Sequence, residues 1–501
     1  MPTPTPTPTP TLQRLAELAG ARVVNAPAGE VPVTFVGLDS SQVEPGGLFA
    51  ALPGTRVHGA SYAFDSAAGA VLTDEDGLAI IQQTSDRRPV LVVDDVRAVL
   101  GHVAAEIYGH PSRDFTLLGV TGTSGKTTTT YMLERGLTAA GCKVGLIGTT
   151  GTKIMGRDIA TELTTPEAPT LQVLFARMRD EGVTHVVMEV SSHALMLGRV
   201  TGAEFDVAAF TNLSQDHLDF HPTMEDYFQA KALFFDPASE LRAARSVVCV
   251  DDEWGQRMAA LAESPVTVAT RGEADITAEL VRIDASGTQH VRLHGAGPDR
   301  EFALPMPGAF NVANAALAAG VAEVAGVDLD AFLAGLERAA VPGRMERIDE
   351  GQPFVAVVDY AHKPAAIGAV LSTLRGQVDG RIGVAVGAGG DRDASKRPLM
   401  GAEAAKGADY VVVTDDNPRT EDPAAIRAAV LEGARGAGTG AEIVEIGPRG
   451  EAIDALVAWA RPGDAIIVVG KGHEVGQLVG DRKLHFDDRE EMRRALAGRK
   501  A

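Results

Sequence analysis

Cysteine, long apolar runs and positive charge are all scarce in this chain. Its 501 residues include two cysteines, Cys142 and Cys249, which excludes a disulfide framework and indicates a reducing compartment. No run approaches the roughly 18 apolar residues that cross a membrane. The N-terminus also lacks the basic and apolar segments of a signal peptide. We therefore expect a cytoplasmic protein with no stable membrane insertion.

The charge balance is strongly acidic, with a formal net charge of −21. Nucleic-acid binding needs clustered Lys and Arg, so we expect no nucleic-acid partner. An apolar content of 45% and a charged content of 23% are typical of globular proteins. Small anionic ligands in locally basic pockets remain compatible with this composition.

The length predicts three folded domains, at roughly 100–200 residues each. A Thr-Pro repeat makes residues 1–11 a disordered, polyproline-like tail. We expect an N-terminal domain at 12–110, a central domain at 111–341 and a C-terminal domain at 342–501.

Short apolar strands alternate with helical stretches in each of these domains. The predicted strands are 33–38, 47–52 and 90–93, then 115–120, 143–148, 184–190, 205–210 and 246–250, and finally 354–358, 381–386, 409–414 and 464–469. This alternation predicts an α/β fold with mostly parallel, doubly wound sheets. The central domain is expected to be P-loop-like, the C-terminal domain Rossmann-like, and the N-terminal domain a smaller α/β unit. Functional loops then lie at the carboxyl ends of strands.

The most informative stretch is the Gly/Thr-rich loop at 119–130, between an apolar strand and a helix. Gly122 and Gly125 let backbone N–H groups approach an anion, and Lys126 can reach terminal phosphates. Val120 stands six residues before Lys126, where the common pattern has glycine, so the loop is a variant. A turn that binds no nucleotide is the alternative.

Oxygen and nitrogen ligands for Mg²⁺ follow the loop. Thr127 or Thr128 offers a hydroxyl, and Glu189 ends a strand as a hard carboxylate ligand. His217 is a candidate ligand or phosphate contact. Capping of the next helix is the alternative for Glu189.

Lys231 is isolated among large apolar residues at 227–235. Burial would lower its pKa and leave an amine able to react with CO₂. From the residues alone, a surface lysine whose stem covers apolar neighbours is the favoured interpretation.

Two further groups of polar residues lie near the domain junction and in the C-terminal domain. Asn311 and Asn314 stand one helical turn apart and suit a purine edge, with helix capping by Asn311 as the alternative. Arg344 lies at the junction, where closure could bring it to a phosphate. Three later strand-end loops present Arg392, Asp416, Asn417, Arg419 and Glu474. Guanidiniums, acids and an amide together suit a zwitterion, although any single loop could be a solvated turn.

Taken together, these motifs resemble the Mur ligases. The resemblance rests on the loop at 122–128, Glu-Val-Ser-Ser-His at 189–193, Thr-Asn-Leu-Ser-Gln-Asp-His-Leu-Asp at 211–219, the isolated lysine and Asp-Tyr-Ala-His at 359–362. Asp-Asn-Pro-Arg at 416–419 and Gly-Lys-Gly-His-Glu at 470–474 narrow it to the members that add the third residue of the peptidoglycan stem.

The resemblance implies an ADP-forming ligase of cell-wall precursor synthesis. ATP would phosphorylate the D-Glu side-chain carboxylate of UDP-MurNAc-L-Ala-D-Glu, and a diamino acid would attack the acyl phosphate. The implied cofactors are Mg²⁺ and a carbamate on Lys231, the partners are these small molecules, and the expected state is a monomer.

The resemblance also implies the site residues. ATP would contact Gly122, Thr123, Ser124, Gly125, Lys126, Thr127, Thr128, Asn311, Asn314, Arg344 and Asp359. The metal ions would contact Thr127, Glu189, His217 and carbamylated Lys231, and the catalytic residues would be Lys126, Lys231 and His217. The UDP-sugar would contact Leu38, Ser40, Thr164, Thr165, Ser191 and Arg199. The amino acid would contact Arg392, Asp416, Asn417, Pro418, Arg419, Gly470 and Glu474. Two positions depart from the family's pattern: Ser41 replaces a frequent arginine and Leu163 a frequent asparagine.

The identity of the diamino acid depends on Arg419 and Arg392. A guanidinium pairs with the distal carboxylate of meso-diaminopimelate, which lysine and ornithine lack. We therefore favour meso-diaminopimelate, while L-lysine and L-ornithine stay open because an arginine can pair with a neighbouring acid. A folylpolyglutamate-type or other Mur ligase, and a nucleotide-binding regulatory module without catalysis, are the rival classes.

Overall fold

The computed structural model describes residues 9–54, 56–161, 163–217, 220–284, 287–295 and 297–499. Most of the expected Thr-Pro tail lies outside these residues, as do Leu218 and Asp219 of the motif at 211–219. Thr11, at the end of that expected tail, caps the first helix and forms a β-bridge with Pro32.

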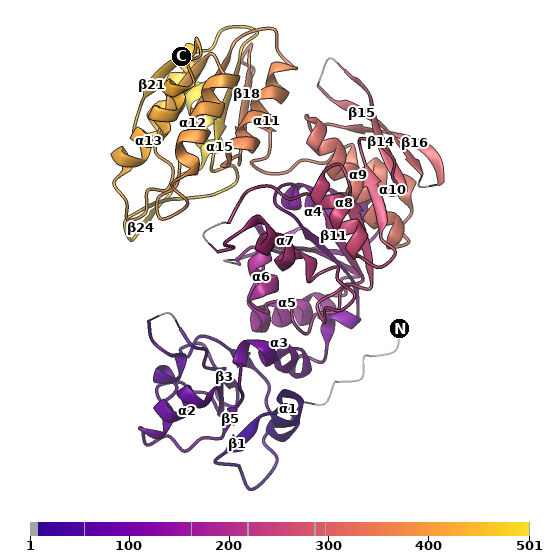
Figure 1. Ribbon diagram of the computed structural model, residues 1–501, viewed down its shortest axis with the longest axis vertical. Helices are drawn as coiled ribbons and strands as arrows, with labels where there is room; N and C mark the ends of the chain where they lie inside the picture. Colours follow the sequence, from indigo (N-terminus) through magenta and orange to yellow (C-terminus); the bar gives the residue numbers. More distant parts are fainter. Residues whose placement is uncertain are drawn as a thin grey trace.

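Three sheet-based units follow one another along an elongated molecule (Figure 1). The N-terminal unit lies at one end, the C-terminal unit at the other, and the large central unit between them. The expected domain breaks at 110/111 and 341/342 fall between the sheets and stay a prediction.

The N-terminal unit has a five-stranded sheet in the order β1-β5-β4-β3-β2, parallel except for β1 against β5. Its elements are α1 (Leu12–Ala19), β1 (Arg22–Val24), β2 (Val36–Gly37), β3 (Leu48–Ala50), η1 (Gly59–Tyr62), β4 (Ala70–Thr73), α2 (Glu75–Gln82), β5 (Val90–Val92) and α3 (Val96–Ile107). The sequence predicted β2, β3 and β5 but not β1 or β4.

The central unit has an 11-stranded sheet in the order β16-β15-β14-β13-β12-β11-β6-β10-β7-β8-β9. Its strands are β6 (Thr116–Thr121), β7 (Val144–Gly148), β8 (Gly151–Ile154), β9 (Arg157–Ile159), β10 (His185–Glu189), β11 (Val207–Phe210), β12 (Arg245–Cys249), β13 (Val266–Ala269), β14 (Ile276–Ile283), β15 (Gln289–Gly295) and β16 (Gly297–Leu304). The helical segments are η2 (Pro111–Arg113), α4 (Lys126–Ala139), α5 (Ala168–Asp180), α6 (Ser192–Met196), α7 (Met224–Ala232), α8 (Glu253–Leu261), α9 (Ala309–Val324) and α10 (Leu329–Leu336). The middle of the sheet is parallel, and antiparallel strands extend both edges.

The C-terminal unit has a six-stranded sheet in the order β17-β18-β22-β19-β20-β21, parallel except for β17. Its elements are β17 (Glu346–Arg347), β18 (Val355–Asp359), α11 (Pro364–Arg375), β19 (Ile382–Val386), α12 (Lys396–Gly407), β20 (Tyr410–Val413), α13 (Pro423–Gly436), β21 (Glu442–Glu445), α14 (Arg449–Trp459), β22 (Ala465–Val469), β23 (Gln477–Val479), β24 (Arg482–Leu484) and α15 (Asp488–Arg499).

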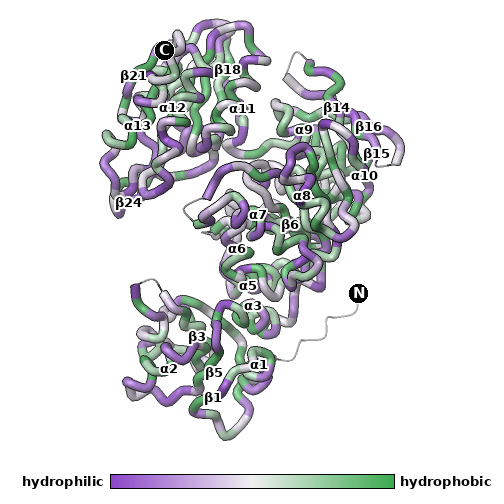
Figure 2. The backbone as a smooth tube through the Cα atoms, viewed as in Figure 1, coloured by the Kyte–Doolittle hydropathy of each residue, from purple (hydrophilic) through white to green (hydrophobic). Residues whose placement is uncertain are grey.

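Helices cover both faces of the two larger sheets, which confirms the predicted doubly wound α/β class. In the central unit, α4, α9 and α10 bury one face and α5, α7 and α8 the other. In the C-terminal unit, α11 to α13 cover one face, and α14 with α15 the other. Figure 2 shows hydrophobic residues concentrated along strands and inner helices, and hydrophilic residues along connecting loops. Among the described helices, none has the length and apolar character that a membrane crossing requires.

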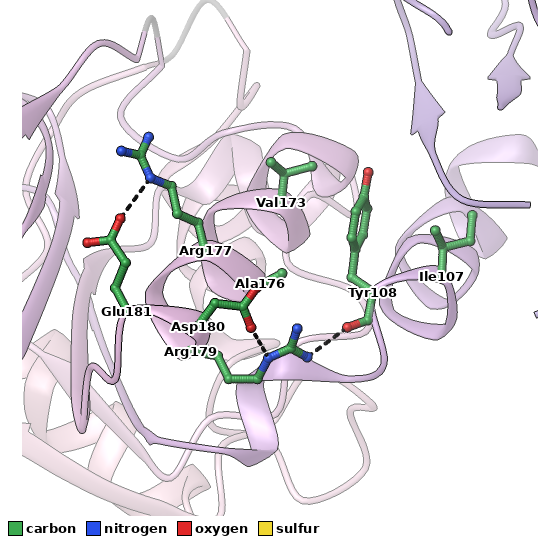
Figure 3. A pocket seen from close by; sticks show the side chains of 8 residues that line it. All are labelled: Ile107, Tyr108, Val173, Ala176, Arg177, Arg179, Asp180 and Glu181. Atoms are coloured by element: carbon green, nitrogen blue, oxygen red, sulfur yellow. Dashed lines mark hydrogen bonds and ion pairs between the residues drawn. The ribbon is translucent and has the colours of Figure 1, made fainter. Parts of the chain in front are cut away.

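The N-terminal and central units meet where α3 packs beside α5. A hollow of about 540 Å³ lies at this junction. Figure 3 shows the side chains that line it. Arg179 Nη1 donates to the carbonyl of Tyr108 at 3.0 Å, and burial raises the pKa of the Tyr108 hydroxyl to about 12. None of the predicted site residues lines this hollow.

Candidate active site

A glycine-containing loop, residues 122–125, connects β6 to α4 at the middle of the central sheet. Gly122 and Gly125 have φ values of 142° and 90°. A Cβ at Gly122 would lie 1.9 Å from Thr211 Oγ1, and one at Gly125 would lie 2.4 Å from Asn314 Oδ1. Only glycine fits both positions, and the loop lies at the N-terminus of α4, which favours anions.

The segment after β11 holds this loop in place. Thr123 N donates to the carbonyl of Asn212 at 2.9 Å, and Ser124 N donates to Asn212 Oδ1 at 3.0 Å. Thr211 Oγ1 donates to the carbonyl of Ser124 at 2.7 Å. The loop is therefore preorganised before any ligand contacts it.

Glu189 lies at the end of β10, beside the start of α4. Its side chain is 1% exposed and accepts from Thr127 Oγ1 at 3.0 Å and from Thr149 N at 2.8 Å. Ser191, not Glu189, caps α6, so the capping alternative for Glu189 is wrong. Of the two threonines considered for Mg²⁺, Thr127 is the one that contacts this carboxylate.

The carboxylate of Glu189 and the hydroxyl of Thr127 are oxygen ligands of the kind that Mg²⁺ prefers. The described residues contain no cluster of three or more His, Cys, Asp or Glu side chains placed to hold a metal. Mg²⁺ needs fewer protein ligands than that, because it is commonly bound by one or two carboxylates together with substrate phosphates. His217 is half exposed, lies 3.1 Å from Asp216 and contacts the Tyr227 ring edge-on.

Lys231 is buried, which corrects the surface interpretation favoured from the residues alone. Its side chain is 1% exposed, because α7 packs against the sheet in the second central core. Its Nζ donates to the carbonyl of Gly122 at 2.9 Å and lies 4.7 Å from the centre of the Tyr227 ring. Burial, and then the charge of Lys126, lowers the pKa of Lys231 well below its ordinary value.

Lys126 also approaches the carbonyl of Gly122, from the start of α4. Its Nζ donates to the carbonyls of Gly122 at 2.9 Å and Thr123 at 3.1 Å. Burial, together with the charge of Lys363, lowers the pKa of Lys126 to about 8. The loop is consequently a concentrated positive site.

A cavity of about 340 Å³ opens beside the loop, between the central and C-terminal units. This volume lies within the range that small-molecule ligands occupy, roughly 300–1,000 Å³. Seven predicted ATP residues line it: Ser124, Gly125, Thr128, Asn311, Asn314, Arg344 and Asp359. Sequence reasoning missed the other walls, among them Cys249, Asp252, Phe310 and the face of α11 formed by Ala365, Ala366, Ala369 and Val370.

Asn311 and Asn314 lie on consecutive turns of α9. Gly308 is the N-cap of that helix, so the capping alternative for Asn311 is wrong. Asn311 Nδ2 donates to the carbonyl of Pro307 at 2.7 Å, and Asn314 Nδ2 donates to Asn311 Oδ1 at 3.3 Å. The pair is thereby oriented at the cavity wall.

The C-terminal unit reaches into the loop region from the opposite side. Arg344 Nη2 donates to Thr127 Oγ1 at 3.4 Å, and its guanidinium lies 4.3 Å from the Tyr360 ring. Asp359 accepts from Met345 N at 2.6 Å, and burial raises its pKa. The approach of Arg344 to a phosphate was expected from its place at the domain junction, whereas its contact with Thr127 was not predicted.

Four of the residues expected to contact the UDP-sugar gather around the end of β10. Thr165 Oγ1 donates to the carbonyl of Glu189 at 2.8 Å, and Ser191 N donates to Thr165 Oγ1 at 3.1 Å. Arg199 Nη1 donates to the carbonyl of Thr165 at 3.3 Å. Thr164 Oγ1 lies 3.1 Å from Thr149 Oγ1.

Leu38 and Ser40, the other two expected sugar contacts, are on the N-terminal unit. They directly follow β2, and β2 packs beside α5 of the central unit. These two residues therefore lie at the edge of the N-terminal unit that adjoins the central unit.

The residues expected to bind the amino acid lie at the carboxyl ends of β19, β20 and β22. A Cβ at Gly389 would lie 3.0 Å from Arg419 Nη1 and 3.9 Å from Arg392 Cγ, so both arginines flank this glycine. A Cβ at Gly470 would lie 2.5 Å from Asp416 Oδ2. Pro418 is buried.

Lys471, to which the sequence analysis gave no role, connects these loops through hydrogen bonds. Lys471 is fully buried, and its Nζ donates to Asn417 Oδ1 at 2.8 Å and to the carbonyl of Gly476 at 2.8 Å. Asn417 Nδ2 in turn donates to Glu474 Oε2 at 3.2 Å. Burial, and then the charge of Asp416, raises the pKa of Glu474.

The loop, the buried carboxylate and the cavity form a site suited to a nucleoside triphosphate at the junction of two α/β units, which is typical of ATP-dependent enzymes. Models of known families match three parts of the chain. They are described as Mur ligase family, catalytic domain, at residues 32–108; Mur ligase middle domain, at 120–322; and Mur ligase, glutamate ligase domain, at 343–472.

Individual proteins agree with these matches. A Corynebacterium glutamicum protein named UDP-N-acetylmuramoyl-L-alanyl-D-glutamate--2,6-diaminopimelate ligase is 62% identical over 93% of this chain and 92% of its own length. A solved structure of a ligase with that name has 32% identity and a TM-score of 0.64, and the match covers 94% of this chain and 96% of that one. Mycobacterium tuberculosis folylpolyglutamate synthase shares the fold at 23% identity, with a TM-score of 0.60 over 74% of this chain and 92% of its own. The chain belongs to the Mur ligase family.

Proposed function

We propose that this chain joins meso-diaminopimelate to UDP-MurNAc-L-Ala-D-Glu, using ATP and releasing ADP. The observation that carries the proposal is the pair Arg392 and Arg419, which flank Gly389 at the strand ends that also present Glu474. The name of the Corynebacterium glutamicum relative supports the same reaction.

The chemical problem is to make a carboxylate electrophilic. The γ-phosphorus of ATP forms a bond to a carboxylate oxygen, and its bond to the bridging oxygen breaks, so that ADP leaves with the electron pair. The diamino acid's amine then attacks the acyl carbon, phosphate leaves, and the nitrogen loses a proton. Lys126 and the N–H groups at 122–128 stabilise the negative charge on the transferring phosphoryl group.

The cavity wall is proposed to hold the nucleoside. Asn311 and Asn314 suit a purine edge, and Arg344 and Asp359 reach the cavity from the C-terminal unit. Glu189 and Thr127 would hold Mg²⁺, with His217 nearby, and the ion would supply charge neutralisation for phosphoryl transfer.

Lys231 is proposed to carry a carbamate. Its burial and lowered pKa favour a neutral amine, which forms an N–C bond to CO₂ and releases one proton. The product is an anion, which relieves the crowding of positive charge at Gly122. A mass increment of one CO₂ on the peptide that contains Lys231 would support this assignment.

The two substrates are proposed to enter from opposite ends of the central unit. Leu38, Ser40, Thr164, Thr165, Ser191 and Arg199 would contact the UDP-sugar. Asp416, Asn417, Pro418, Gly470 and Glu474 would contact the amino acid together with the two arginines. A monomeric state and a cytoplasmic location stay predictions from the sequence.

The environment of Arg419 favours a substrate with a distal carboxylate. The neighbouring acid Glu421 pairs with Arg397 at 2.8 Å, whereas Arg419 Nη1 donates to the carbonyl of Gly390 at 2.7 Å. Within the described chain, no carboxylate lies within ion-pair distance of Arg419. L-Lysine and L-ornithine stay the alternatives, because Arg419 can keep its hydrogen bond to the carbonyl of Gly390 when the substrate has no distal carboxylate.

The deciding experiment measures ADP release with UDP-MurNAc-L-Ala-D-Glu and each diamino acid in turn. We expect turnover with meso-diaminopimelate and at least tenfold lower kcat/KM with L-lysine and L-ornithine, since these substrates offer no distal carboxylate to the half-buried guanidinium of Arg419. Arg419→Leu should remove that preference, and Arg375→Leu, which disrupts a salt bridge to Asp409 at the other end of β20, should retain it. Equal rates with all three amino acids would contradict the proposal, and activity with glutamate alone would favour a folylpolyglutamate-type ligase.

A further inference from the structure

Lys363 lies at the start of α11, where a lysine does not stabilise the helix. It is the N-cap of α11, a site that usually carries Ser, Thr, Asp or Asn, and it makes no capping hydrogen bond. A cation is also unfavourable at the positive end of a helix dipole. Nevertheless, its side chain is only 11% exposed, so it must be held by contacts outside α11.

Those contacts cross from the C-terminal unit to the phosphate loop. Lys363 Nζ lies 2.6 Å from Asp216 Oδ2 and 3.5 Å from the carbonyl of Thr123. The ion pair therefore links the two units directly beside the loop.

The ammonium groups of Lys126 and Lys363 converge at this point with the amine of Lys231. Lys126 and Lys363 share the carbonyl of Thr123, and Lys126 and Lys231 share that of Gly122. Within the described chain, Asp216 is the one carboxylate at ion-pair distance from any of the three. So much positive charge around two carbonyls suits a ligand with several negative charges.

The position of Lys363 along that ligand follows from the cavity. Ser124, Gly125 and Thr128 line the cavity, whereas Lys126 and Lys363 do not. The nucleoside end therefore lies on the cavity side of the loop, and the two lysines lie at the far end, where the terminal phosphate is expected.

We propose that Lys363 binds the terminal phosphate of ATP and then the acyl phosphate, exchanging its ion pair with Asp216 for the phosphoryl oxygens. This proposal rests on the proposed ligase function. The exchange forms and breaks no covalent bond. It would give the C-terminal unit its own charge contact with the phosphoryl group, so that ATP and ADP are distinguished across the interface.

The test compares the affinities of Lys363→Met for a non-hydrolysable ATP analogue and for ADP, measured by calorimetry with Mg²⁺. We expect a loss of about 10- to 100-fold for the analogue, typical of a lost charge-assisted contact, and less than about threefold for ADP. Lys363→Arg should recover most of the loss. Lys406→Met removes a lysine near the end of α12 in the same unit, where it pairs with Glu403, and it should change neither affinity.

Equal weakening of both nucleotides would overturn the proposal, because it would indicate a structural role for Lys363. Unchanged nucleotide affinities with a raised KM for the diamino acid would also overturn it and would assign Lys363 to a substrate carboxylate. Neither binding measurement requires turnover. A wild-type protein that binds both nucleotides but ligates no diamino acid would therefore contradict the proposed function separately.

Discussion

A buried ion pair beneath the amino-acid loops gives a sharp prediction about stability and substrate binding. Arg449 and Asp488 have side-chain exposures of 0%, and Nε and Nη2 each lie 2.7 Å from a carboxylate oxygen. Arg449 Nη2 also donates to the carbonyl of Val469 at 2.9 Å, one residue before Gly470. The same guanidinium thus neutralises a buried charge and holds a substrate loop.

Arg449→Met should destabilise the C-terminal unit by about 3–5 kcal/mol, because it leaves the Asp488 carboxylate buried without a partner. At about 2–4 °C per kcal/mol for a unit of this size, the Tm should fall by roughly 6–20 °C. In the double variant Arg449→Met/Asp488→Leu, apolar side chains replace both charges, so most of that stability should return. The KM for the diamino acid should stay raised in both variants, since the bond to Val469 is lost in each.

The assay uses tryptophan fluorescence during thermal unfolding. The chain has two tryptophans, and Trp254→Phe leaves Trp459, which stacks on Tyr410 at 5.1 Å and ends the helix that begins with Arg449. The remaining signal therefore reports the C-terminal unit. A double variant no more stable than Arg449→Met would refute the argument from an uncompensated charge, and an unchanged KM would refute the positioning role.

Three other predictions address the nucleotide loop, the amino-acid site and the buried lysine. Gly125→Ala should weaken ATP binding at least tenfold, because the added Cβ would lie 2.4 Å from Asn314 Oδ1. Gly141 has a similar φ of 86° but open space around a Cβ, so Gly141→Ala is the control without a clash. Calorimetry with ATP on both variants separates the clash from backbone strain. Glu474 must be ionised to accept the substrate ammonium, and burial raises its pKa, so the KM for the diamino acid should fall as pH rises through that raised value; a Glu474→Gln variant with the same pH profile would argue against this. Burial lowers the pKa of Lys231 in the folded state, so folding at neutral pH is penalised by this lysine. The penalty shrinks as the pH approaches the pKa of the unfolded state, about 10.4. In CO₂-free buffer, Lys231→Met should therefore raise the Tm at neutral pH, raise it less in alkaline buffer, and abolish turnover.

Much of the fold could be predicted because parallel strands buried on both faces appear as continuous apolar runs. The strands predicted at 115–120, 184–190 and 464–469 correspond to β6, β10 and β22 within two residues at each end. The strands β14 to β16, which extend the sheet to one edge, were not predicted. Five of the eight residues of β14 are exposed, and the strand has no clear apolar run, so only pairing with its neighbours defines it.

The candidate site was predictable where local chemistry determines position. The spacing of Gly122, Gly125 and Lys126 predicts a phosphate-binding loop from the sequence alone. Strand-end positions likewise placed Glu189 and Asp416 at the carboxyl ends of β10 and β20. The burial of Lys231 was not visible, because an isolated lysine on a helix is equally compatible with solvent until its neighbours are known. Contacts between units, such as the pair of Lys363 with Asp216, depend on the packing of two sheets and have no local signature.

The central claim is that ATP activates the substrate carboxylate as an acyl phosphate at the loop before α4. The most direct measurement supplies UDP-MurNAc-L-Ala-D-Glu with heavy oxygen in the D-Glu side-chain carboxylate, together with ATP and meso-diaminopimelate. The account predicts that one heavy oxygen appears in inorganic phosphate for each amide formed, because the carboxylate oxygen leaves with the phosphoryl group. Unlabelled phosphate alongside normal amide formation would contradict it.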